Sequence, residues 1–206
     1  GRYGEGGAYR DPNSPYRSWY DFDSKYKGGY RSWWGFETLP EVNEETPSYV
    51  EFITGEGGVI DTWLRRGAAG FRLDVADELP DEFIEKVRTA VKRVGPDKFL
   101  LGEVWEDATT KFGFDKRRTY LLGKGLDSVM NYPFKNAVLG FVCGRDAGQT
   151  MTDILSICEH YPAPALDTAL NFLSTHDTER ALTVIADEPA NGRGREWQSG
   201  RCVTGD

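Results

Sequence analysis

The chain alternates short apolar runs with longer stretches in which apolar residues recur every three or four positions. Runs of the first kind predict β-strands, and they cover about 70–75, 98–105, 126–131 and 169–175. The second pattern predicts helices over about 48–66, 80–94, 133–142 and 148–160, with another beginning near 179. We expect the first helix to be interrupted at Gly55, Gly57 and Gly58. Asp81 and Glu82 open the 80–94 helix and Lys92 and Arg93 close it, which complements the helix dipole.

Strands that alternate with helices predict a parallel sheet covered by helices. Two architectures remain, an open doubly wound sheet and a (β/α)8 barrel. No GxGxxG or P-loop motif follows any strand, so the main sequence support for a nucleotide-binding open sheet is missing. Charged residues instead end three of the four strands, namely Asp74, Glu103 and His176–Asp177. We therefore predict an α/β fold that is part of a TIM barrel.

Residues 1–46 carry no sustained period and contain many Gly, Asp, Asn and Pro residues, which indicates an irregular segment. This stretch is dense in aromatic side chains, among them Trp19, Trp33, Trp34 and Phe36. The texture changes at Pro47. We expect two domains, a loop-rich segment over 1–46 and the partial barrel over 47–206.

Composition narrows the possible partners and the redox chemistry. The net charge of −8 over 206 residues disfavours nucleic acid and anionic membranes, and no apolar run is long enough to span a bilayer. Cys143, Cys158 and Cys202 are too few and too scattered for a disulfide framework or a zinc site. We expect Cys143 and Cys158 to be buried. The chain begins GRYGEGG and ends CVTGD, so we expect a piece of a longer protein.

The first strand carries a candidate nucleophile. Strand side chains alternate between faces, so Arg72 and Asp74 share a face, and a neighbouring cation keeps a carboxylate charged. The alternative is a buried Arg–Asp pair that only stabilises the barrel. On the next strand Glu103 shares a face with Trp105. An apolar neighbour suits a general acid, whereas the alternative is a partly exposed strand-end carboxylate.

A third acidic group, Asp177, follows the last predicted strand beside His176. Its alternative role is to begin the next helix, with Asp177 or Thr178 as N-cap. Two carboxylates on neighbouring strand ends, in different surroundings, are the apparatus of glycosidic-bond hydrolysis. Aromatic residues of the 1–46 segment could stack on sugar rings or simply on each other.

Several segments resemble the signature segments of the alpha-amylase family, glycoside hydrolase family 13. GFRLDVADE, GEVWE and FLSTHDTER are similar to its second, third and fourth segments, and LPEVN at 39–43 resembles a further segment near the end of its domain B. WWGFETLPEVNE and HDTERALT look most like neopullulanases, cyclomaltodextrinases and amylopullulanases of bacteria. The match is highly specific at the level of the family.

The resemblance implies particular roles. Asp74 would be the nucleophile, Arg72 its positioning partner, Glu103 the general acid/base and Asp177 the transition-state stabiliser, with His176 on the same sugar ring. The implied reaction retains anomeric configuration through a covalent glucosyl-enzyme, and the implied fold is a barrel, here about strands 4 to 7, preceded by domain B. The family's first signature segment and eighth strand are not in this sequence, so we expect the chain alone to be inactive.

The expected substrate is an α-glucan, and the alternatives are a transglycosylase or branching enzyme and an inactive binding homologue. Asp77, Glu78 and Trp105 would border the substrate, although Asp77 and Glu78 could equally be helix N-terminal charges. The chemistry needs no cofactor. Ca²⁺ is compatible with the oxygen ligands of Asp and Asn at 11, 13, 21 and 23. Secretion, oligomeric state and linkage preference stay open.

Overall fold

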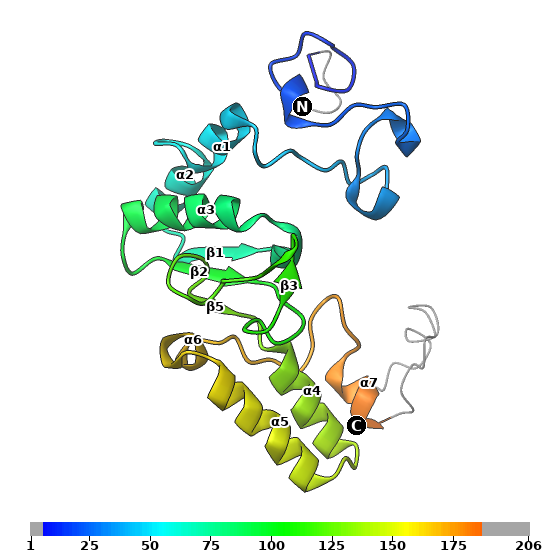
Figure 1. Cartoon of the computed structure of the whole chain (residues 1–206), viewed down its shortest axis with the longest axis vertical. Coiled ribbons are helices and arrows are strands. Elements are labelled where there is room, and N and C mark those ends of the chain that lie inside the picture. Colours follow the sequence, from blue (N-terminus) through cyan, green and yellow to red (C-terminus); the bar gives the residue numbers. More distant parts are fainter. Residues whose placement is uncertain (1–5, 187–206) are drawn as a thin grey trace. The chain divides into compact units, whose positions relative to one another are not determined.

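The computed structural model describes residues 6–186, so Cys202 lies outside the described residues. The chain divides into two compact units. One unit combines the residues before 70 with 82–98, and the other combines 70–81 with the residues from 99 onward. Figure 1 shows the order of the elements along the chain.

The first unit begins with the irregular segment that its lack of period predicts. Before Pro47 its described residues form short 3₁₀ turns, namely η1 (Arg17–Trp19), η2 (Lys27–Gly29) and η3 (Trp33–Gly35). Isolated antiparallel bridges fix this segment, and they join Tyr20 to Val42, Phe22 to Tyr30 and Ser32 to Pro40. Turns, backbone bridges and contacts between aromatic rings therefore hold this segment in its conformation.

Three helices follow, where the periodicity predicts them. These are α1 (Pro47–Thr54), α2 (Val59–Arg65) and α3 (Asp81–Val94). The predicted interruption between α1 and α2 is confirmed, since α1 ends at Thr54 and α2 begins at Val59. A Cβ at Gly58 would lie 2.7 Å from the Phe52 carbonyl oxygen. On α3 the apolar stripe of Ile84, Val87 and Val91 is buried, as expected of an amphipathic helix.

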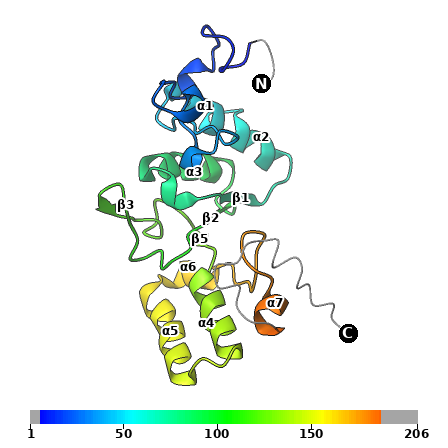
Figure 2. The same cartoon turned by 90° about the vertical axis from the view of Figure 1, so that its right-hand side faces the viewer.

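The second unit is built on a parallel sheet of β1 (Gly70–Leu73), β2 (Phe99–Gly102) and β5 (Ser128–Val129). Its order is β1-β2-β5, and the strands lie side by side in Figures 1 and 2. The register pairs Leu73 with Gly102, so the carboxyl ends of β1 and β2 are level. Gly70 is required by close approach, because a Cβ there would lie 2.0 Å from the Phe99 carbonyl oxygen.

The strand expected over 169–175 is largely wrong. The described chain forms one parallel bridge here, between Met130 and Leu170, and Leu170 hydrogen-bonds only to Val129 and Asn131. Beyond Leu170 the Asn171 side chain accepts a hydrogen bond from the Asn131 amide at 3.0 Å. The ladder ends here because the Asn131 carbonyl accepts the Lys135 N–H at 3.2 Å as the next helix begins, and Pro133 has no N–H to donate. The sheet order nevertheless follows the sequence order without reversal, as in a barrel.

The remaining helices are α4 (Tyr132–Val142), α5 (Ala147–His160), α6 (Ala163–Asp167) and α7 (Ala181–Ala186). The side chains of Asn131 and Asp146 cap α4 and α5 by accepting the N–H groups of Phe134 and Gln149. Both views place α4 and α5 side by side. The periodicity did not predict α6 or the hairpin of β3 (Phe112–Gly113) and β4 (Lys116–Arg117), since these elements are too short to show a period.

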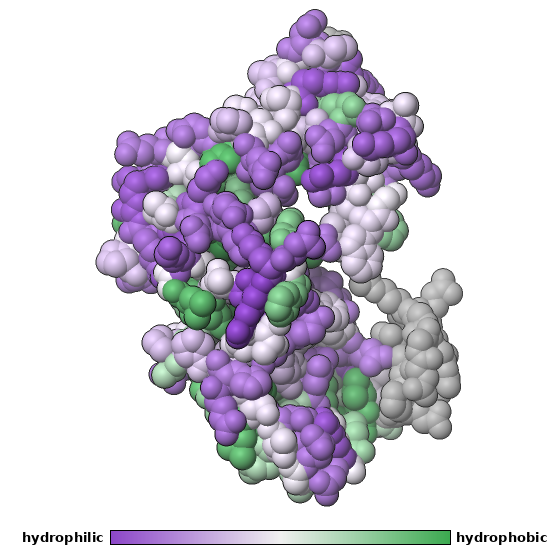
Figure 3. All heavy atoms as spheres, in the orientation of Figure 1, coloured by the Kyte–Doolittle hydropathy of each residue, from purple (hydrophilic) through white to green (hydrophobic). Residues whose placement is uncertain are grey.

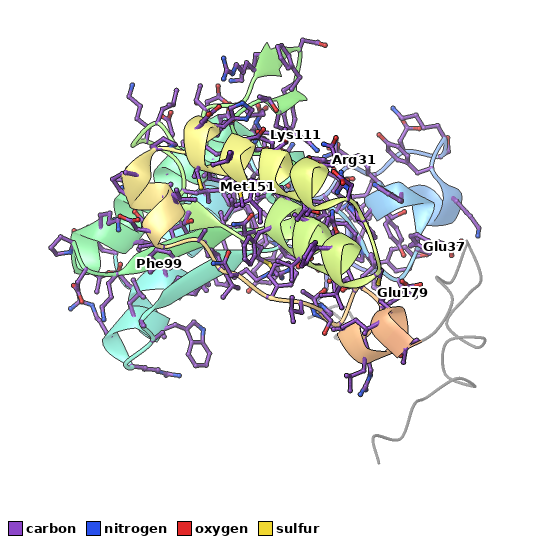
Figure 4. All side chains as sticks on the ribbon, turned by 90° about the horizontal axis from the view of Figure 1, so that it is seen from below. Arg31, Glu37, Phe99, Lys111, Met151 and Glu179 are labelled. Atoms are coloured by element: carbon purple, nitrogen blue, oxygen red, sulfur yellow. The ribbon has the colours of Figure 1, made fainter. Side chains whose placement is uncertain are left out.

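The expectation of buried cysteines is wrong, because Cys143 and Cys158 are both exposed. On α5 the buried face carries Thr150 and Ile157, and Cys158 lies on the exposed part together with Met151 (Figure 4). Apolar side chains thus reach the surface of this unit, among polar ones (Figure 3). The apolar neighbours of a cysteine in sequence do not fix its face on a helix.

Candidate active site

Two carboxylates follow the ends of adjacent parallel strands. Asp74 comes directly after β1, and Glu103 comes directly after β2. The backbone joins the two ends further, since the Glu103 N–H donates to the Leu73 carbonyl at 3.0 Å and the Ala76 N–H donates to the Glu103 carbonyl at 3.1 Å. The strand-end rule thus predicted positions that the fold brings to one edge.

One guanidinium contacts both carboxylates. Arg72 Nη1 donates to Asp74 Oδ1 at 2.5 Å, and Arg72 Nη2 lies 3.0 Å from Glu103 Oε2. The second contact is an ion pair and not a hydrogen bond, because Nη2 is buried without a correctly aligned acceptor. Arg72 Nε is directed at the Met130 sulfur, 3.2 Å away. A planar cation therefore lies between the two acids and offsets their mutual repulsion.

The two acids differ in exposure. The Asp74 side chain is 72% exposed, whereas Glu103 is 5% exposed. Glu103 Oε1 accepts from the Trp105 indole N–H at 3.0 Å and lies 3.5 Å from the Tyr132 hydroxyl. These contacts correct two expectations: Glu103 is buried and not a partly exposed strand end, and Trp105 is a donor to it as well as an apolar neighbour. Arg72 pairs with Asp74, as their shared strand face predicts, and with Glu103 as well.

The turn after Asp74 has an unusual backbone. Val75 adopts φ 45° and ψ 49°, the left-handed region, which is costly for a β-branched residue. Its N–H donates to Glu103 Oε2 at 2.8 Å. The 3₁₀ turn η4 (Ala76–Glu78) follows directly. Glu103 therefore holds the Asp74 turn through its side chain as well as through its backbone.

Asp177 and His176 lie in the loop after Leu170. His176 Nε2 is 3.1 Å from Asp177 Oδ2, and the Asp177 N–H donates to the Thr175 hydroxyl at 3.2 Å. The alternative of an N-cap is wrong, since α7 begins at Ala181. A shallow hollow lined by 174–176, Thr178 and 180–183 includes His176 but none of the three carboxylates.

Tyr132 connects this loop electrostatically to Glu103. Burial raises the pKa of Tyr132, and the charges of Glu103 and Asp177 raise it further, against the lowering effects of Thr175 and Arg72. Its ring stacks on Trp105 at 4.6 Å and an interplanar angle of 14°. Sequence reasoning missed Tyr132, although it follows β5 closely, because the search at strand ends was limited to charged residues.

Asp77 and Glu78 have different environments. Asp77 Oδ1 accepts from the Tyr120 hydroxyl at 2.8 Å, and Asp77 Oδ2 lies 2.9 Å from Lys111 Nζ; Lys111 is labelled in Figure 4. Glu78 is exposed. Burial lowers the pKa of Lys111, but its contacts with Glu106 and Asp77 outweigh this and raise it overall. Both carboxylate oxygens of Asp77 are therefore used by the protein itself.

Metal ligation finds little support among the described residues, where no three His, Cys, Asp or Glu side chains form a group that could hold an ion. Of the acidic residues considered for Ca²⁺, Asp21 lies 3.5 Å from Arg31 and Asp23 lies 3.3 Å from Lys25. Asp21 and Asp23 are therefore already paired with cations of the protein itself. Over the same described range no helix is long and apolar enough to cross a bilayer.

The family model "Alpha amylase, catalytic domain" matches residues 9–198. An amylopullulanase of Thermoanaerobacter thermohydrosulfuricus is 34% identical over 87% of the chain and 13% of its own length, and a cyclomaltodextrinase of a Bacillus species is 37% identical over 72% and 25%. The chain therefore spans a small part of these relatives.

Solved structures agree. One is the complex of the cyclic alpha-maltosyl-(1→6)-maltose hydrolase of Arthrobacter globiformis with maltose. It superposes with a TM-score of 0.76 at 28% identity, over 88% of this chain and 40% of that one. The fold is thus of the TIM-barrel α/β type. With these matches and two carboxylates at adjacent strand ends, the chain belongs to the alpha-amylase catalytic-domain family, glycoside hydrolase family 13.

Proposed function

We propose that this chain carries the catalytic carboxylates of a retaining glycoside hydrolase that cleaves α-glucosidic bonds in starch-like glucans such as maltooligosaccharides, pullulan and cyclodextrins. The carrying observation is the Arg72 guanidinium, which contacts Asp74 at 2.5 Å and Glu103 at 3.0 Å. Two carboxylates held close together on one face are what the double-displacement mechanism requires. Family membership supplies the sugar class, since relatives are named amylopullulanase, cyclomaltodextrinase and neopullulanase.

In the first step Asp74 attacks the anomeric carbon. A bond forms between its carboxylate oxygen and that carbon while the glycosidic C–O bond breaks, and Glu103 transfers its proton to the leaving oxygen. The 72% exposure of Asp74 suits a nucleophile that must reach a bound sugar. Arg72 orients it and limits its rotation.

In the second step water attacks the glucosyl-enzyme and Glu103 takes the proton from that water, so the anomeric configuration is retained. Trp105 and Val75 donate hydrogen bonds to Glu103, and Arg72 lies 3.0 Å from it, so its side chain is held in one place for both proton transfers. Asp177 would hold sugar hydroxyls more tightly in the transition state than in the ground state, and His176 would contact the same ring.

Substrate would be bound mainly by aromatic faces and by polar groups around the turn. Trp105 is 45% exposed, and its ring stacks on that of Tyr132. Trp105 therefore presents a ring face beside Glu103. In the first unit Trp34 and Phe36 are 75% and 55% exposed, and both belong to a stack with Trp33. We further propose that Asp77 and Glu78 border the substrate, Glu78 with its exposed carboxylate and Asp77 through the turn it fixes.

We infer the domain organisation from the same premises. Residues 1–46 would form a domain B-like segment, and 47–206 would contain about strands 4 to 7 of the barrel. The sequential parallel order of β1, β2, β5 and the Leu170 bridge supports this numbering. The first signature segment and the eighth strand would be supplied by the rest of the protein.

The test uses the full-length protein that carries this chain. Asp74→Asn should reduce turnover of maltotriose or pullulan by roughly 10³-fold or more while binding is largely kept, because the nucleophile acts after binding. A 5-fluoroglucosyl fluoride should label the wild-type peptide that contains Asp74, as seen by mass spectrometry. Proton NMR should first detect the α-anomer of the product. Activity of Asp74→Asn within a few-fold of wild type would refute the assignment, and products longer than the substrate would indicate a transferase.

A further inference from the structure

Arg118 is buried to an extent that is unusual for an arginine. It follows β4, and its side chain is 0% exposed. Arginine is almost never fully buried unless its charge is paired. Its Nε donates to Asp81 Oδ1 at 2.7 Å, and the guanidinium carbon lies 4.5 Å from the Tyr120 ring centre and 5.1 Å from that of Phe114. One ion pair and two ring faces thus compensate the charge.

The other guanidinium donors go to a single turn. Nη1 donates to the Asp77 carbonyl at 2.7 Å, and Nη2 donates to the Leu79 carbonyl at 2.6 Å and more weakly to the Ala76 carbonyl at 3.5 Å. These carbonyls belong to η4 and the residue after it. A short 3₁₀ turn leaves its carbonyl groups without enough partners, and Arg118 supplies them.

This turn begins with the strained residue beside the nucleophile. Val75 has φ 45°, and a strained backbone persists only when its surroundings over-determine it. Glu103 fixes the start of the turn, through the N–H groups of Val75 at 2.8 Å and Ala76 at 3.1 Å. Arg118 fixes its end. Contacts at both ends of the turn therefore keep Val75 in its strained conformation.

We propose that Arg118 is a positioning residue for the glycosidic reaction: it holds the 76–79 turn so that Val75 keeps its left-handed conformation and Asp74 keeps its aim. The inference rests on the proposed function. Arg118 acts through the backbone and contacts neither acid directly. Lysine cannot replace it, because only the planar fork serves several carbonyls at once.

Arg118→Lys in the full-length protein tests the proposal. We expect kcat on maltotriose to fall about 10- to 100-fold with KM changed less than about threefold, because a displacement of about 1 Å at the reacting atoms has this effect. Arg93→Lys is the matched control, since Arg93 also pairs with a buried aspartate, Asp61, at 2.7 Å and donates to the Thr54 carbonyl at 2.9 Å. It should lower the melting temperature and leave kcat unchanged.

A coupling experiment separates positioning from general stabilisation. Glycine adopts φ near 45° without strain, so in a Val75→Gly background Arg118→Lys should reduce kcat by less than about threefold. Val75→Ala removes the branched side chain but keeps the Cβ and the strain, so the larger loss should persist there. Equal losses in the two backgrounds, or wild-type kcat in Arg118→Lys, would overturn the proposal.

Folding of the variant and activity of the wild type are checked separately. If Arg118→Lys does not fold, Arg118→Gln is measured instead in the wild-type, Val75→Gly and Val75→Ala backgrounds. Its side-chain amide can still donate to a backbone carbonyl, and the same comparison of kcat losses applies. If the wild-type protein does not hydrolyse α-glucans, the proposed function fails, and the inference, which rests on it, fails with it. If wild type is active and Asp74→Asn is inactive, the function stands and the Arg118 data decide the inference alone.

Discussion

Glu103→Gln tests whether Glu103 is the general acid, because the variant cannot supply the proton that the proposed acid must transfer. The substitution keeps the side-chain volume and removes the ionisable group. One amide nitrogen must replace one carboxylate oxygen, and both oxygens face donors in this structure. Oε2 receives the Val75 N–H at 2.8 Å and lies 3.0 Å from Arg72, whereas Oε1 faces the Trp105 N–H and the Tyr132 hydroxyl.

The contacts decide which way the amide turns and how much stability it loses. A nitrogen at the Oε2 position would face an N–H and a cation, so we expect it at the Oε1 position. There the Tyr132 hydroxyl can rotate and accept, and Trp105, which is 45% exposed, can turn its N–H to water. The penalty should then fall near the lower end of the range for a buried unsatisfied group, about 1 to 2 kcal/mol. The variant should therefore remain folded.

The effect on turnover should depend on the leaving group. An acid contributes about 10²- to 10⁴-fold where the leaving oxygen needs a proton. We expect a loss of this size in kcat/KM for maltotriose and a loss of less than about tenfold for α-glucosyl fluoride, whose leaving group needs little protonation. Azide should accelerate turnover of the fluoride in the variant, since azide attacks the glucosyl-enzyme without the base that Glu103 provides for water.

The comparison of the two substrates decides the role of Glu103. Equal losses on maltotriose and on α-glucosyl fluoride, together with no response to azide, would mean that Glu103 is not the acid/base. Unfolding in urea provides the control for stability. If Glu103→Gln shifted the midpoint far more than the expected 1 to 2 kcal/mol implies, the contacts assigned to the carboxylate oxygens would be wrong.

Two further predictions concern the first unit. The backbone N–H of Gly57 and the side chain of Arg93 lower the pKa of Asp61. Asp61 therefore stabilises the fold above pH ~3.8, and this contribution is lost as pH falls through the lower folded value. The urea midpoints of wild type and Asp61→Asn should differ at pH 7 and approach each other as the pH is lowered below about 4; a gap that stays constant would contradict this. Trp34→Ala should weaken binding of soluble starch in affinity electrophoresis about tenfold, whereas Trp63→Ala, a helix tryptophan that is 52% exposed, should not; equal effects would remove the sugar-stacking role of Trp34.

Local chemistry made much of this fold predictable. The helix α3 begins at Asp81 and buries Ile84, Val87 and Val91, and each of these features depends on residues within a few positions of each other. The break before α2 follows from glycines for the same reason. Asp74 and Glu103 were found because a barrel brings the ends of neighbouring strands together whatever the detailed packing.

Features that depend on distant partners were not predictable in this way. Arg118 meets carbonyl groups of the 76–79 turn about forty positions earlier in the chain, and it follows a hairpin too short to show a period. The contact of Arg72 with Glu103 joins two strands, so reasoning within one strand predicted only the pairing of Arg72 with Asp74. Likewise, the strand after Leu170 is lost because the neighbouring chain has already turned into α4, where the Lys135 N–H takes the Asn131 carbonyl.

Tyr132 shows what a strand-end search should include. It lies three positions after the end of β5 and is the first residue of α4, and an aromatic residue there is normally assigned to the core. It is indeed buried, with 2% exposure, and it packs with Leu101 and Met130. Its hydroxyl nevertheless lies 3.5 Å from Glu103. Because a phenol can bury its ring and still direct a donor at a catalytic carboxylate, burial of a strand-end tyrosine is no argument against a role in the site.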